Sequence, residues 1–155
     1  MRAIIRPYKR IETRLGVGRS LTTCKQTSDR MARIRQHATA PELEVRKLAS
    51  RAGLRFTTNN RDLPGSPDLA NRKRRVAIFV HGCFWHAHLH CKKATIPKNN
   101  QEFWTNKFKR NRERDSEVSG VLQTRGYRVV IIWECEVSNP ALVESRIQHG
   151  TLASS

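Results

Sequence analysis

The alternation of apolar and polar positions along the chain predicts helices at three places. Residues 41–52 open with a proline at the first helical position, carry apolar residues at helical spacing and stop at Gly53, which are the signals of a helix with defined ends. Residues 101–125 show the same period over a longer stretch and stop before a glycine. A last short helix is predicted to begin at residues 139–140, and the tail from Gly150 is expected to fray.

Strands are predicted where apolar residues run together. Residues 76–80 form a short apolar run that is typical of a buried strand, and residues 127–133 form a nearly continuous one that is typical of a central strand covered on both faces. A further strand is predicted at residues 54–58, and the turn-rich residues 63–69 lead into another strand before a hairpin turn at residues 71–75. This order of helices and strands predicts an α/β fold with a mixed central sheet flanked by helices.

The charge of the chain narrows the class of partner. Its 155 residues hold 30 Lys and Arg against 13 Asp and Glu, a formal net charge of +17. Such a charge is self-repulsive in a single domain and favours a polyanionic partner, nucleic acid first. A membrane is the rival partner, but no apolar run approaches the roughly 18 residues of a spanning helix. The chain also begins without the apolar core of a signal peptide, so we expect a cytoplasmic protein.

Basic residues are densest at the start of the chain. Residues 1–36 contain ten Lys and Arg against two acids, with weak apolar periodicity. We predict that residues 1–27 form a basic extension without persistent structure; a basic arm that becomes ordered on nucleic acid is the alternative. A short helix over residues 31–35 would lead into a single folded domain, which we place at residues 28–150.

Reactive side chains concentrate in residues 80–91, directly after an apolar run. This segment holds four of the six histidines and two of the four cysteines. Cys83, His88 and Cys91 lie close together in sequence. Cys135 follows the strongest predicted strand and would complete a tetrahedral zinc site if the two strands are neighbours. Because four protein ligands leave no open position, such a zinc would be structural.

Two alternatives remain open at this cluster. His90 could replace His88 as the imidazole ligand. The cysteines could instead be buried free thiols, which behave as small hydrophobic residues. The expected reducing compartment argues against disulfides for all four cysteines, Cys24 included.

Asp68 is a candidate ligand of a catalytic cation. It follows a rigid turn at the start of a predicted strand, where a structural ion pair is the alternative. A carboxylate that faces nucleic acid is unfavourable unless a divalent cation lies between them, and Mg²⁺ is bound at phosphates by one or two carboxylates. Glu42 in the first helix is the best candidate for a second, outer-shell carboxylate.

His86 and His81 are candidates for proton transfer. Imidazole titrates near neutral pH and can take the proton of an attacking water, whereas packing or solvent exposure is the ordinary explanation of a lone histidine. His86 lies among the proposed zinc ligands without being needed to complete their site. Asp115 or Glu113 on the long helix could hold its ring.

Aromatic and basic residues near this segment indicate a surface for bases. Phe84 and Trp85 are adjacent, so on an extended segment both cannot point into one core, and stacking between bases in a basic groove is the favoured interpretation. Trp104 opens a helix rich in basic and amide side chains, among them Lys107 and Asn111. For Trp104, core packing is an equal alternative.

Four motifs of the sequence together resemble the very-short-patch-repair (Vsr) endonucleases. They are Leu63-Pro64-Gly65-Ser66-Pro67-Asp68, Phe79-Val80-His81-Gly82-Cys83-Phe84-Trp85-His86, Glu102-Phe103-Trp104 and Val130-Ile131-Ile132-Trp133-Glu134-Cys135. The resemblance covers roughly residues 28–137. It implies the restriction-endonuclease-like fold of the PD-(D/E)XK type, with the acid-x-Lys half of that motif replaced by the region of Val80 and His81.

The resemblance implies an enzyme that nicks one DNA strand 5′ of the thymine in T:G mismatches left by deamination of 5-methylcytosine, in a Mg²⁺-dependent hydrolysis. By position, the residues implied in catalysis are Asp68 and the Val80 backbone carbonyl as Mg²⁺ ligands, His86 as general base, Asp115 as its orienting partner, and His81 and Glu42 as supporting polar groups.

The same resemblance implies contacts with DNA and with zinc. Phe84, Trp85 and Trp104 would wedge into the duplex beside the mismatch, and Met31 would enter from the opposite groove. The implied zinc ligands are Cys83, His88, Cys91 and Cys135.

The chain departs from the family pattern between Cys83 and Cys91, where the interval is one residue longer than expected. This keeps the choice between His88 and His90 open, and residues 1–26 have no family counterpart. The rival functions are a restriction or defence nuclease that nicks paired or modified DNA, and a zinc-stapled DNA-binding module without catalysis. The expected partners are mismatched double-stranded DNA and mismatch-repair proteins, and we expect a monomer.

Overall fold

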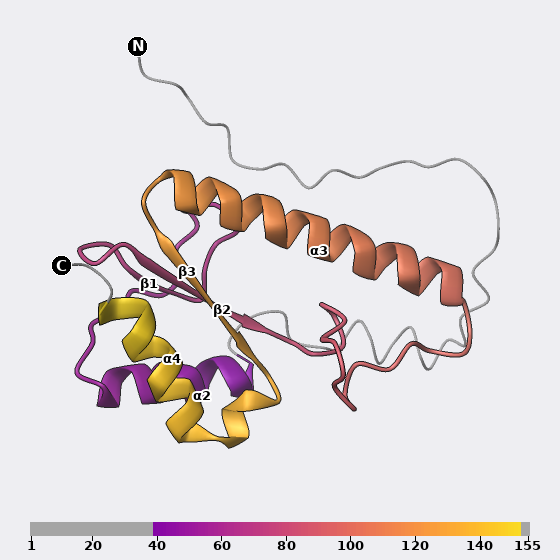
Figure 1. Ribbon diagram of the computed structural model, residues 1–155, viewed down its shortest axis with the longest axis horizontal. Helices are drawn as coiled ribbons and strands as arrows, with labels where there is room; N and C mark the ends of the chain where they lie inside the picture. Colours follow the sequence, from indigo (N-terminus) through magenta and orange to yellow (C-terminus); the bar gives the residue numbers. More distant parts are fainter. Residues whose placement is uncertain (1–38, 153–155) are drawn as a thin grey trace, which may run out of the picture. The chain divides into compact units, whose positions relative to one another are not determined.

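The computed structural model of the chain describes residues 39–152 (Figure 1). Its elements are, in chain order, α2 (Ala40–Arg51), β1 (Leu69–Asn71), β2 (Val76–His81), α3 (Gln101–Thr124), β3 (Arg128–Trp133), the 3-10 helix η1 (Glu136–Ser138) and α4 (Pro140–Leu152). The predictions for the basic extension, the helix over residues 31–35, Cys24 and Met31 lie outside the described residues. Within the described part, every helix is too short or too polar to cross a membrane.

The sheet has three strands in the order β1-β2-β3. β1 pairs with β2 in antiparallel fashion, and β2 pairs with β3 in parallel, from Val76 opposite Arg128 to His81 opposite Trp133. The parallel register places the ends of two strands, at His81 and Trp133, side by side. The predicted mixed sheet of an α/β fold is therefore confirmed.

Helices cover both faces of this sheet (Figure 1). In β2, Val76 and Ile78 belong to a buried cluster that includes Leu48 of α2 and Ile147 of α4. Ala77, between them, belongs to a second cluster, which contains Leu122 of α3. This alternation is the pleat of a strand that is buried on both faces. It fixes α3 on the face opposite α2 and α4.

The helix ends follow the sequence signals. α2 carries a proline in its first turn, after Thr39 in an extended conformation with φ −68° and ψ 159°. Gly53 follows this helix at φ +70°, a left-handed conformation that glycine adopts without steric cost. α3 is followed in the same way by Gly126 at φ +76°. The two predicted helices are therefore confirmed.

The predicted strand over residues 54–58 is wrong. In this segment Thr57 alone pairs, in an isolated bridge in which the N–H groups of Thr57 and Ala70 donate to each other's carbonyls at 2.8 and 3.0 Å. Side chains bond to the backbone on this segment: Nδ2 of Asn71 donates to the Arg55 carbonyl at 3.0 Å, and Nδ2 of Asn60 donates to the Thr57 carbonyl at 2.9 Å. Local side-chain bonds of this kind compete with sheet formation.

The expected fraying from Gly150 is also wrong, because α4 continues to Leu152. Gly150 lies so close to β3 that a Cβ atom there would stand 2.4 Å from a methyl group of Val130. The buried hydroxyl of Thr151 donates to the Ile147 carbonyl at 3.0 Å. Close packing against the sheet therefore holds the last helical turn.

Candidate active site and metal centre

The segment after β2 folds back on itself at the end of the parallel strand pair. The His86 N–H donates to the Gly82 carbonyl at 3.2 Å, and the His88 N–H donates to the Cys83 carbonyl at 3.0 Å. Ala87 adopts φ +47° between them. The segment is a compact turn, so side chains that are near neighbours in sequence can meet on one side of it.

Cys83, His88, Cys91 and Cys135 form one cluster, with ligand atoms that all lie within 4.8 Å of one another. Nδ1 of His88 lies 3.6 Å from Sγ of Cys83 and 3.4 Å from Sγ of Cys135. A tetrahedral zinc, with Zn–S bonds of about 2.3 Å and Zn–N bonds of about 2.1 Å, separates its ligand atoms by about 3.6–3.8 Å. The cluster thus has the dimensions and the donor chemistry of a zinc site.

His88, rather than His90, is the imidazole of this cluster. Its ring stacks on the indole of Trp133, with centroids 4.0 Å apart and planes inclined by 3°. His90 is exposed and lies outside the cluster, in a left-handed conformation at φ +58°.

Burial governs the protonation of these thiols. It raises the pKa of Cys83 to about 12 and also raises the pKa of Cys135. At Cys91 the backbone of Lys93 has the opposite effect, because a hydrogen bond to the sulfur lowers the pKa. A buried thiol that resists ionisation by itself becomes a thiolate when a divalent metal compensates its charge. The donor set is therefore one that a metal ion would complete.

A second cluster lies at the end of β2, against α3. Nδ1 of His86 forms a hydrogen bond with Oδ2 of Asp115 on α3. The His86 ring also stacks on His81, the last residue of β2, with centroids 3.9 Å apart and planes inclined by 10°. The indole of Trp133 stands edge-on to His81, with centroids 5.4 Å apart. Two strands and a helix thus position this group of side chains.

Asp115, rather than Glu113, is the acid that contacts His86. Glu113 is exposed and pairs with Lys109 at 3.9 Å. A carboxylate at Nδ1 fixes the imidazole tautomer that carries its proton on Nδ1 and leaves Nε2 as an acceptor. That is the tautomer required of a general base.

The charge states in this cluster follow from burial and from contact. Burial, together with the charge of His86, lowers the pKa of His81 to about 4, so His81 is neutral at pH 7. Burial raises the pKa of Asp115, but the hydrogen bond and the charge of His86 outweigh it, and the pKa lies below its usual range. Asp115 is therefore ionised at neutral pH and accepts a hydrogen bond from His86.

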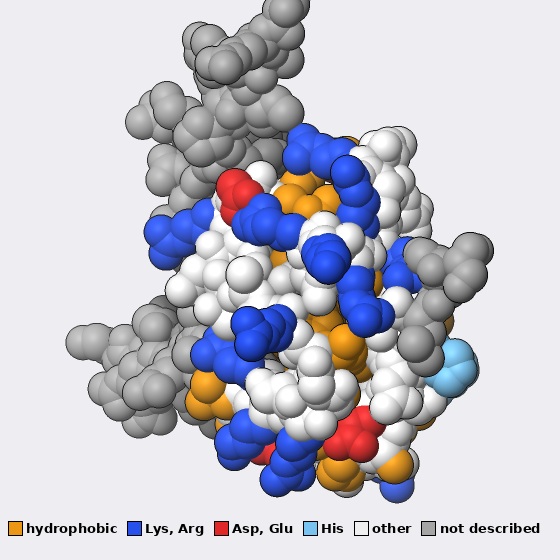
Figure 2. Space-filling model, turned by 90° about the vertical axis from the view of Figure 1, so that its left-hand side faces the viewer, with side chains coloured by type: hydrophobic (Ala, Val, Ile, Leu, Met, Phe, Trp, Pro, Cys, Tyr) orange, Lys and Arg blue, Asp and Glu red, His pale blue; other side chains and the backbone are white. Residues whose placement is uncertain are grey.

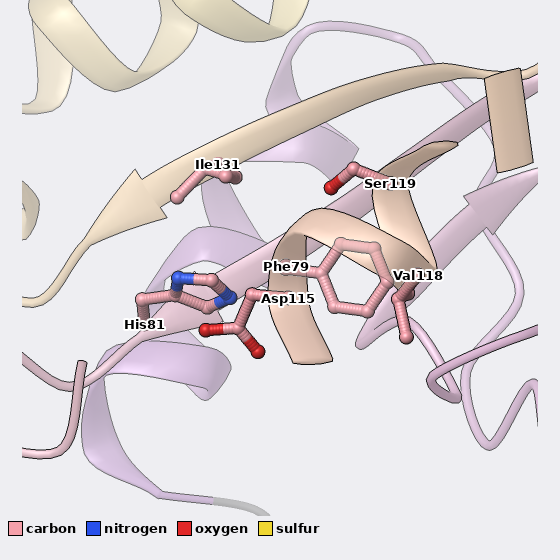
Figure 3. A pocket seen from close by; sticks show the side chains of 6 residues that line it. All are labelled: Phe79, His81, Asp115, Val118, Ser119 and Ile131. Atoms are coloured by element: carbon pink, nitrogen blue, oxygen red, sulfur yellow. The ribbon is translucent and has the colours of Figure 1, made fainter. Parts of the chain in front are cut away.

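These side chains line a cleft of about 610 Å³, together with Arg112 and Ser116 of α3 and Trp133 of β3. Arg112 is exposed and forms no ion pair within the described residues. Figure 3 shows a smaller adjoining cavity of about 10 Å³, at which the His81 imidazole of β2 lies beside the Asp115 carboxylate of α3. The cleft is thus lined by both an imidazole with a free acceptor and a guanidinium.

Asp68 lies where β1 begins, and its Oδ2 accepts a hydrogen bond from the Val80 N–H at 2.7 Å. The N–H and C=O groups of one strand residue point to the same edge of the strand. The Val80 carbonyl therefore faces the side of β2 on which Asp68 lies, one residue before His81. A carboxylate and a backbone carbonyl are hard oxygen donors of the kind that Mg²⁺ prefers, so the residues present fit this ion.

Glu42 lies in the first turn of α2, where its Oε1 accepts a hydrogen bond from the Thr39 hydroxyl at 2.9 Å. This bond between two side chains joins the residue before the helix to its first turn. The role of Glu42 as an outer-shell carboxylate stays a prediction.

Phe84, Trp85 and Trp104 form an aromatic cluster at the start of α3. The Phe84 ring lies 5.1 Å from Trp85 and 5.2 Å from Trp104, edge to face. The expectation that Phe84 and Trp85 point to different sides is wrong, because the segment is a turn and not extended. All three rings remain partly exposed, whereas Phe108, which contacts Phe84, is only 4% exposed.

Lys107 and Asn111 of α3 hold this cluster to the turn. Nδ2 of Asn111 donates to the Trp85 carbonyl at 2.7 Å. Nζ of Lys107 lies 5.1 Å from the ring centroid of Trp85 and 5.4 Å from that of Trp104, a cation–π arrangement. Burial lowers the pKa of this ammonium group. These contacts are structural, and a direct contact of either residue with DNA stays a prediction.

Sequence reasoning missed three residues of the site. Trp133 contacts both clusters, and its position two residues before Cys135 on the strongest strand was a usable signal. Arg112 lies one helical turn before Asp115, so the i, i+3 spacing could have found it. Asn60 is buried and donates to the Pro67 carbonyl at 3.1 Å, which holds the turn before Asp68. For Asn60 the sequence carries no signal.

Known proteins with similar sequences are DNA-nicking and mismatch enzymes. The model of the family DNA mismatch endonuclease Vsr matches residues 20–93. The chain is 40% identical over 119 residues to the Type II nicking enzyme V.XorIIP of Xanthomonas oryzae pv. oryzae, a match that covers 77% of this chain and 87% of that protein. It is 38% identical over 125 residues to the Type II nicking enzyme V.NmeAIP of Neisseria meningitidis, covering 81% and 89%. It is 42% identical over 108 residues to the DNA mismatch endonuclease Vsr of Escherichia coli, covering 70% and 69%.

An α/β domain with a histidine–carboxylate pair in a cleft, together with these relatives, defines the class: the protein is a DNA endonuclease, a hydrolase. The chain belongs to the Vsr family of DNA mismatch endonucleases. The resemblance carried by the four sequence motifs is confirmed. The rival hypothesis of a DNA-binding module without catalysis is therefore discarded.

Proposed function

We propose that this protein nicks one DNA strand 5′ of the thymine in T:G mismatches left by deamination of 5-methylcytosine, by Mg²⁺-dependent hydrolysis of a phosphodiester. The observation that carries the proposal is the His86–Asp115 pair in the cleft at the end of β2, in a chain of the Vsr family. The name of the E. coli relative, DNA mismatch endonuclease, supports mismatched duplex as the substrate.

His86 would be the general base of the reaction. Its Nε2 takes the proton of the attacking water, while Asp115 holds Nδ1 and stabilises the imidazolium that forms. His81 is neutral at pH 7 and stacks on the His86 ring. It therefore orients the ring without placing a second positive charge against it.

Asp68 and the Val80 carbonyl would hold the Mg²⁺, with Glu42 as an outer-shell group. The bond between the Asp68 carboxylate and the Val80 N–H supports this pairing. When bound, Mg²⁺ would neutralise the charge that develops on the phosphate in the transition state. The sheet also supports the PD-(D/E)XK type. It places an acid, Asp68, at the start of one strand, beside a second strand that carries Val80 and His81.

Arg112 would bind the phosphate from the α3 side of the cleft. Its guanidinium lines the same cleft as His86, and it forms no ion pair within the described part of the chain. The planar fork of arginine matches the oxygens of a phosphate and makes charge-assisted hydrogen bonds to them. Arg112 thus would hold the scissile phosphate, or its neighbour, in line with the water on His86.

A structural zinc ion would be held by Cys83, His88, Cys91 and Cys135. The four donor atoms lie within 4.8 Å of one another, and four protein ligands would leave no open position. Because Cys83 follows β2 and Cys135 follows β3, the ion would tie together the two strand ends that form the floor of the cleft.

Selection of the mismatch would come from the aromatic cluster of Phe84, Trp85 and Trp104. Partly exposed rings packed beside a basic helix support insertion between base pairs. A mispaired step is easily unstacked, so insertion there has the lowest deformation energy. Asn111 and Lys107 would contact the duplex beside the rings that they hold.

A second candidate function is nicking of fully paired or modified duplex, as in a restriction or defence system. The observation that favours it is that two of the relatives are named Type II nicking enzymes.

One experiment separates the two functions. Duplexes of one sequence are prepared with T:G, with each other mismatch and fully paired, and the nick is mapped on each strand at saturating zinc, with and without Mg²⁺. We expect Mg²⁺-dependent nicking 5′ of the mispaired thymine. Equal nicking of the paired duplex would establish the second function in its place. Asp68→Ala should abolish nicking while DNA binding persists, and full activity of this variant would remove Asp68 from the mechanism.

A further inference from the structure

A second basic surface lies at the end of the sheet that is opposite the cleft. We call it the hairpin-end surface and define it by Arg55, Arg72, Lys73, Arg74, Arg75 and Arg125. Residues 72–75 form the turn between β1 and β2, and Arg125 directly follows α3. Arg125 is partly exposed and the other five are exposed. Figure 2 views this side of the molecule, where Lys and Arg side chains are spread widely and acidic side chains are sparse.

This surface is separate from the cleft. β2 begins at Val76, next to the turn, and ends at His81, which lines the cleft. At about 3.3 Å per residue these two ends of the strand are roughly 17 Å apart. Residues of the hairpin-end surface are also absent from the lining of the cleft.

Three of the arginines are held in fixed positions. Nη1 of Arg75 donates to the Arg125 carbonyl at 2.7 Å, and Nη1 of Arg74 donates to the Thr151 carbonyl at 3.5 Å. These bonds cap the C-terminal ends of α3 and α4, where a cation is favourable. Arg72 pairs with Asp62 at 2.8 Å. Helix capping therefore accounts for Arg74 and Arg75.

Capping does not account for Arg55 and Lys73. Both are exposed, and neither forms an ion pair within the described residues. The turn follows the sequence Arg-Lys-Arg-Arg, so four cations stand side by side with Asp62 as the acid that pairs with one of them. Cations in such an array repel one another, and a polyanion removes that repulsion.

We propose that the hairpin-end surface binds the sugar-phosphate backbone of a second DNA duplex, distinct from the duplex in the cleft. Cations held at fixed positions at a strand turn match the repeated charges of phosphates. An acidic protein is the less suitable partner, because protein interfaces have apolar and aromatic cores. The large hydrophobic residues that are exposed in the described part lie at positions 43, 89, 96, 121 and 142, none of them in the turn.

Binding of two duplex segments would let the enzyme pass from one segment to another without release into solution. The cleft would stay available for a mismatch while the opposite end of the sheet holds neighbouring DNA by charge alone. This contact would be independent of base sequence, since phosphate contacts position a protein without reading bases.

The test uses the full chain without added Mg²⁺. The chain is first saturated with a short mismatched duplex that carries one fluorophore. A second, fully paired duplex that carries a different fluorophore is then added. Energy transfer between the two duplexes and the sedimentation mass report a complex of one protein with two duplexes. The variant Arg55→Ser/Lys73→Ser removes two cations that have no capping bond or ion pair. Its matched control, Arg46→Ser/Arg51→Ser, removes two exposed cations from α2 that likewise form no ion pair within the described residues.

We expect the wild-type chain to form the two-duplex complex, with an affinity for the second duplex that falls with salt. In Arg55→Ser/Lys73→Ser this affinity should drop about tenfold or more, and the slope of log K against log salt should shrink by about 1.8. The control variant should behave as wild type. Nicking of an isolated short duplex should be equal in all three, so the binding result is decided independently of the catalytic proposal.

Three outcomes would overturn this assignment. The first is a wild-type chain that forms no two-duplex complex at low salt. The second is an equal loss in the control variant, which would make the effect one of net charge. The third is displacement of the second duplex by a polyglutamate of equal charge as readily as by DNA, which would assign the surface to an acidic protein.

Discussion

The imidazole of His81 lies flat against that of His86, with ring centroids 3.9 Å apart and planes inclined by 10°. Two stacked imidazolium ions would repel each other. Burial lowers the pKa of His81 to about 4, whereas His86 is hydrogen-bonded to the carboxylate of Asp115. The stack therefore joins two like side chains with different surroundings: His81 packs as a neutral ring, and His86, the proposed general base, contacts a carboxylate.

The burial of His81 predicts a pH-dependent stability. In the unfolded chain this imidazole is protonated below about 6.5, but in the folded chain only below about 4. Between these values the unfolded state binds more protons, so the free energy of unfolding should fall as the pH drops through this window, by roughly 3 kcal/mol in all. Urea unfolding at a series of pH values, at saturating zinc, measures it. His81→Phe keeps a ring and should lose this part of the pH dependence; identical pH profiles would contradict the prediction.

Replacing Asp115 by Asn should slow nicking about 10²- to 10⁴-fold, the range of general acid–base catalysis. The amide can hold the wrong imidazole tautomer and cannot stabilise the imidazolium. Single-turnover nicking at saturating DNA measures the rate, and gel-shift binding should be unchanged. Glu113→Gln, two residues away and exposed, is the matched control. Equal effects of the two substitutions would show that Asp115 acts through net charge.

Removal of the Arg112 guanidinium should weaken catalysis by about 1.5–3 kcal/mol, the usual contribution of a hydrogen bond to a charged group. Arg112→Ala should therefore lower single-turnover nicking by roughly ten- to a hundredfold, and Arg112→Lys should restore part of it. Arg110, two residues earlier, points to a different side of α3 and serves as the control. A rate in Arg112→Ala equal to that in Arg110→Ala would exclude Arg112 from the cleft chemistry.

The metal cluster predicts different results for its two neighbouring histidines. His88→Ala should lose the bound zinc and lower Tm by about 10 °C or more, because a structural zinc contributes directly to folding free energy. His90→Ala should keep both, since His90 is exposed and outside the cluster. Elemental analysis of the purified variants and thermal unfolding measure the two properties. Zinc retained in His88→Ala and lost in His90→Ala would reverse the assignment.

Trp85→Ala should reduce mismatch selectivity more than stability. Stacking of a base on an aromatic ring contributes about 1–3 kcal/mol, so the ratio of nicking at T:G to nicking at paired duplex should fall about tenfold. Phe108, only 4% exposed, provides the comparison, and Phe108→Ala should destabilise the fold by about 3–5 kcal/mol. A Trp85→Ala variant that is itself unfolded would show that Trp85 belongs to the core.

The sequence was sufficient where local signals agree with the fold. Both long helices had a proline or glycine at their ends, and the apolar strands β2 and β3 could be placed from composition alone. Residues 54–58 were misassigned because the Asn71 side chain, rather than a strand partner, donates to the Arg55 carbonyl, and pairing stays confined to Thr57. Periodicity carries no information about such a competition between partners.

The site shows the same division between local and long-range information. Spacing predicted the members of the zinc-type cluster, but the choice of His88 over His90 depended on a left-handed residue in a turn. The choice of Asp115 over Glu113 depended on which face of α3 meets the β2–β3 strand ends. Arg112 and Trp133 were missed. Both matter because they line the cleft, and the cleft forms only when α3 packs against the strand ends.

The pairing of β2 with β3 brings together metal-ligating residues that are synthesised at different times. Ribosomes build the chain from its start, so Cys83, His88 and Cys91 emerge well before the strand that leads to Cys135. A nascent or prematurely released polypeptide that stops short of β3 has no fourth partner for the cluster and no Trp133 beside His81. Incomplete translation products therefore lack one of the four donors of this cluster and one of the rings that pack against His81.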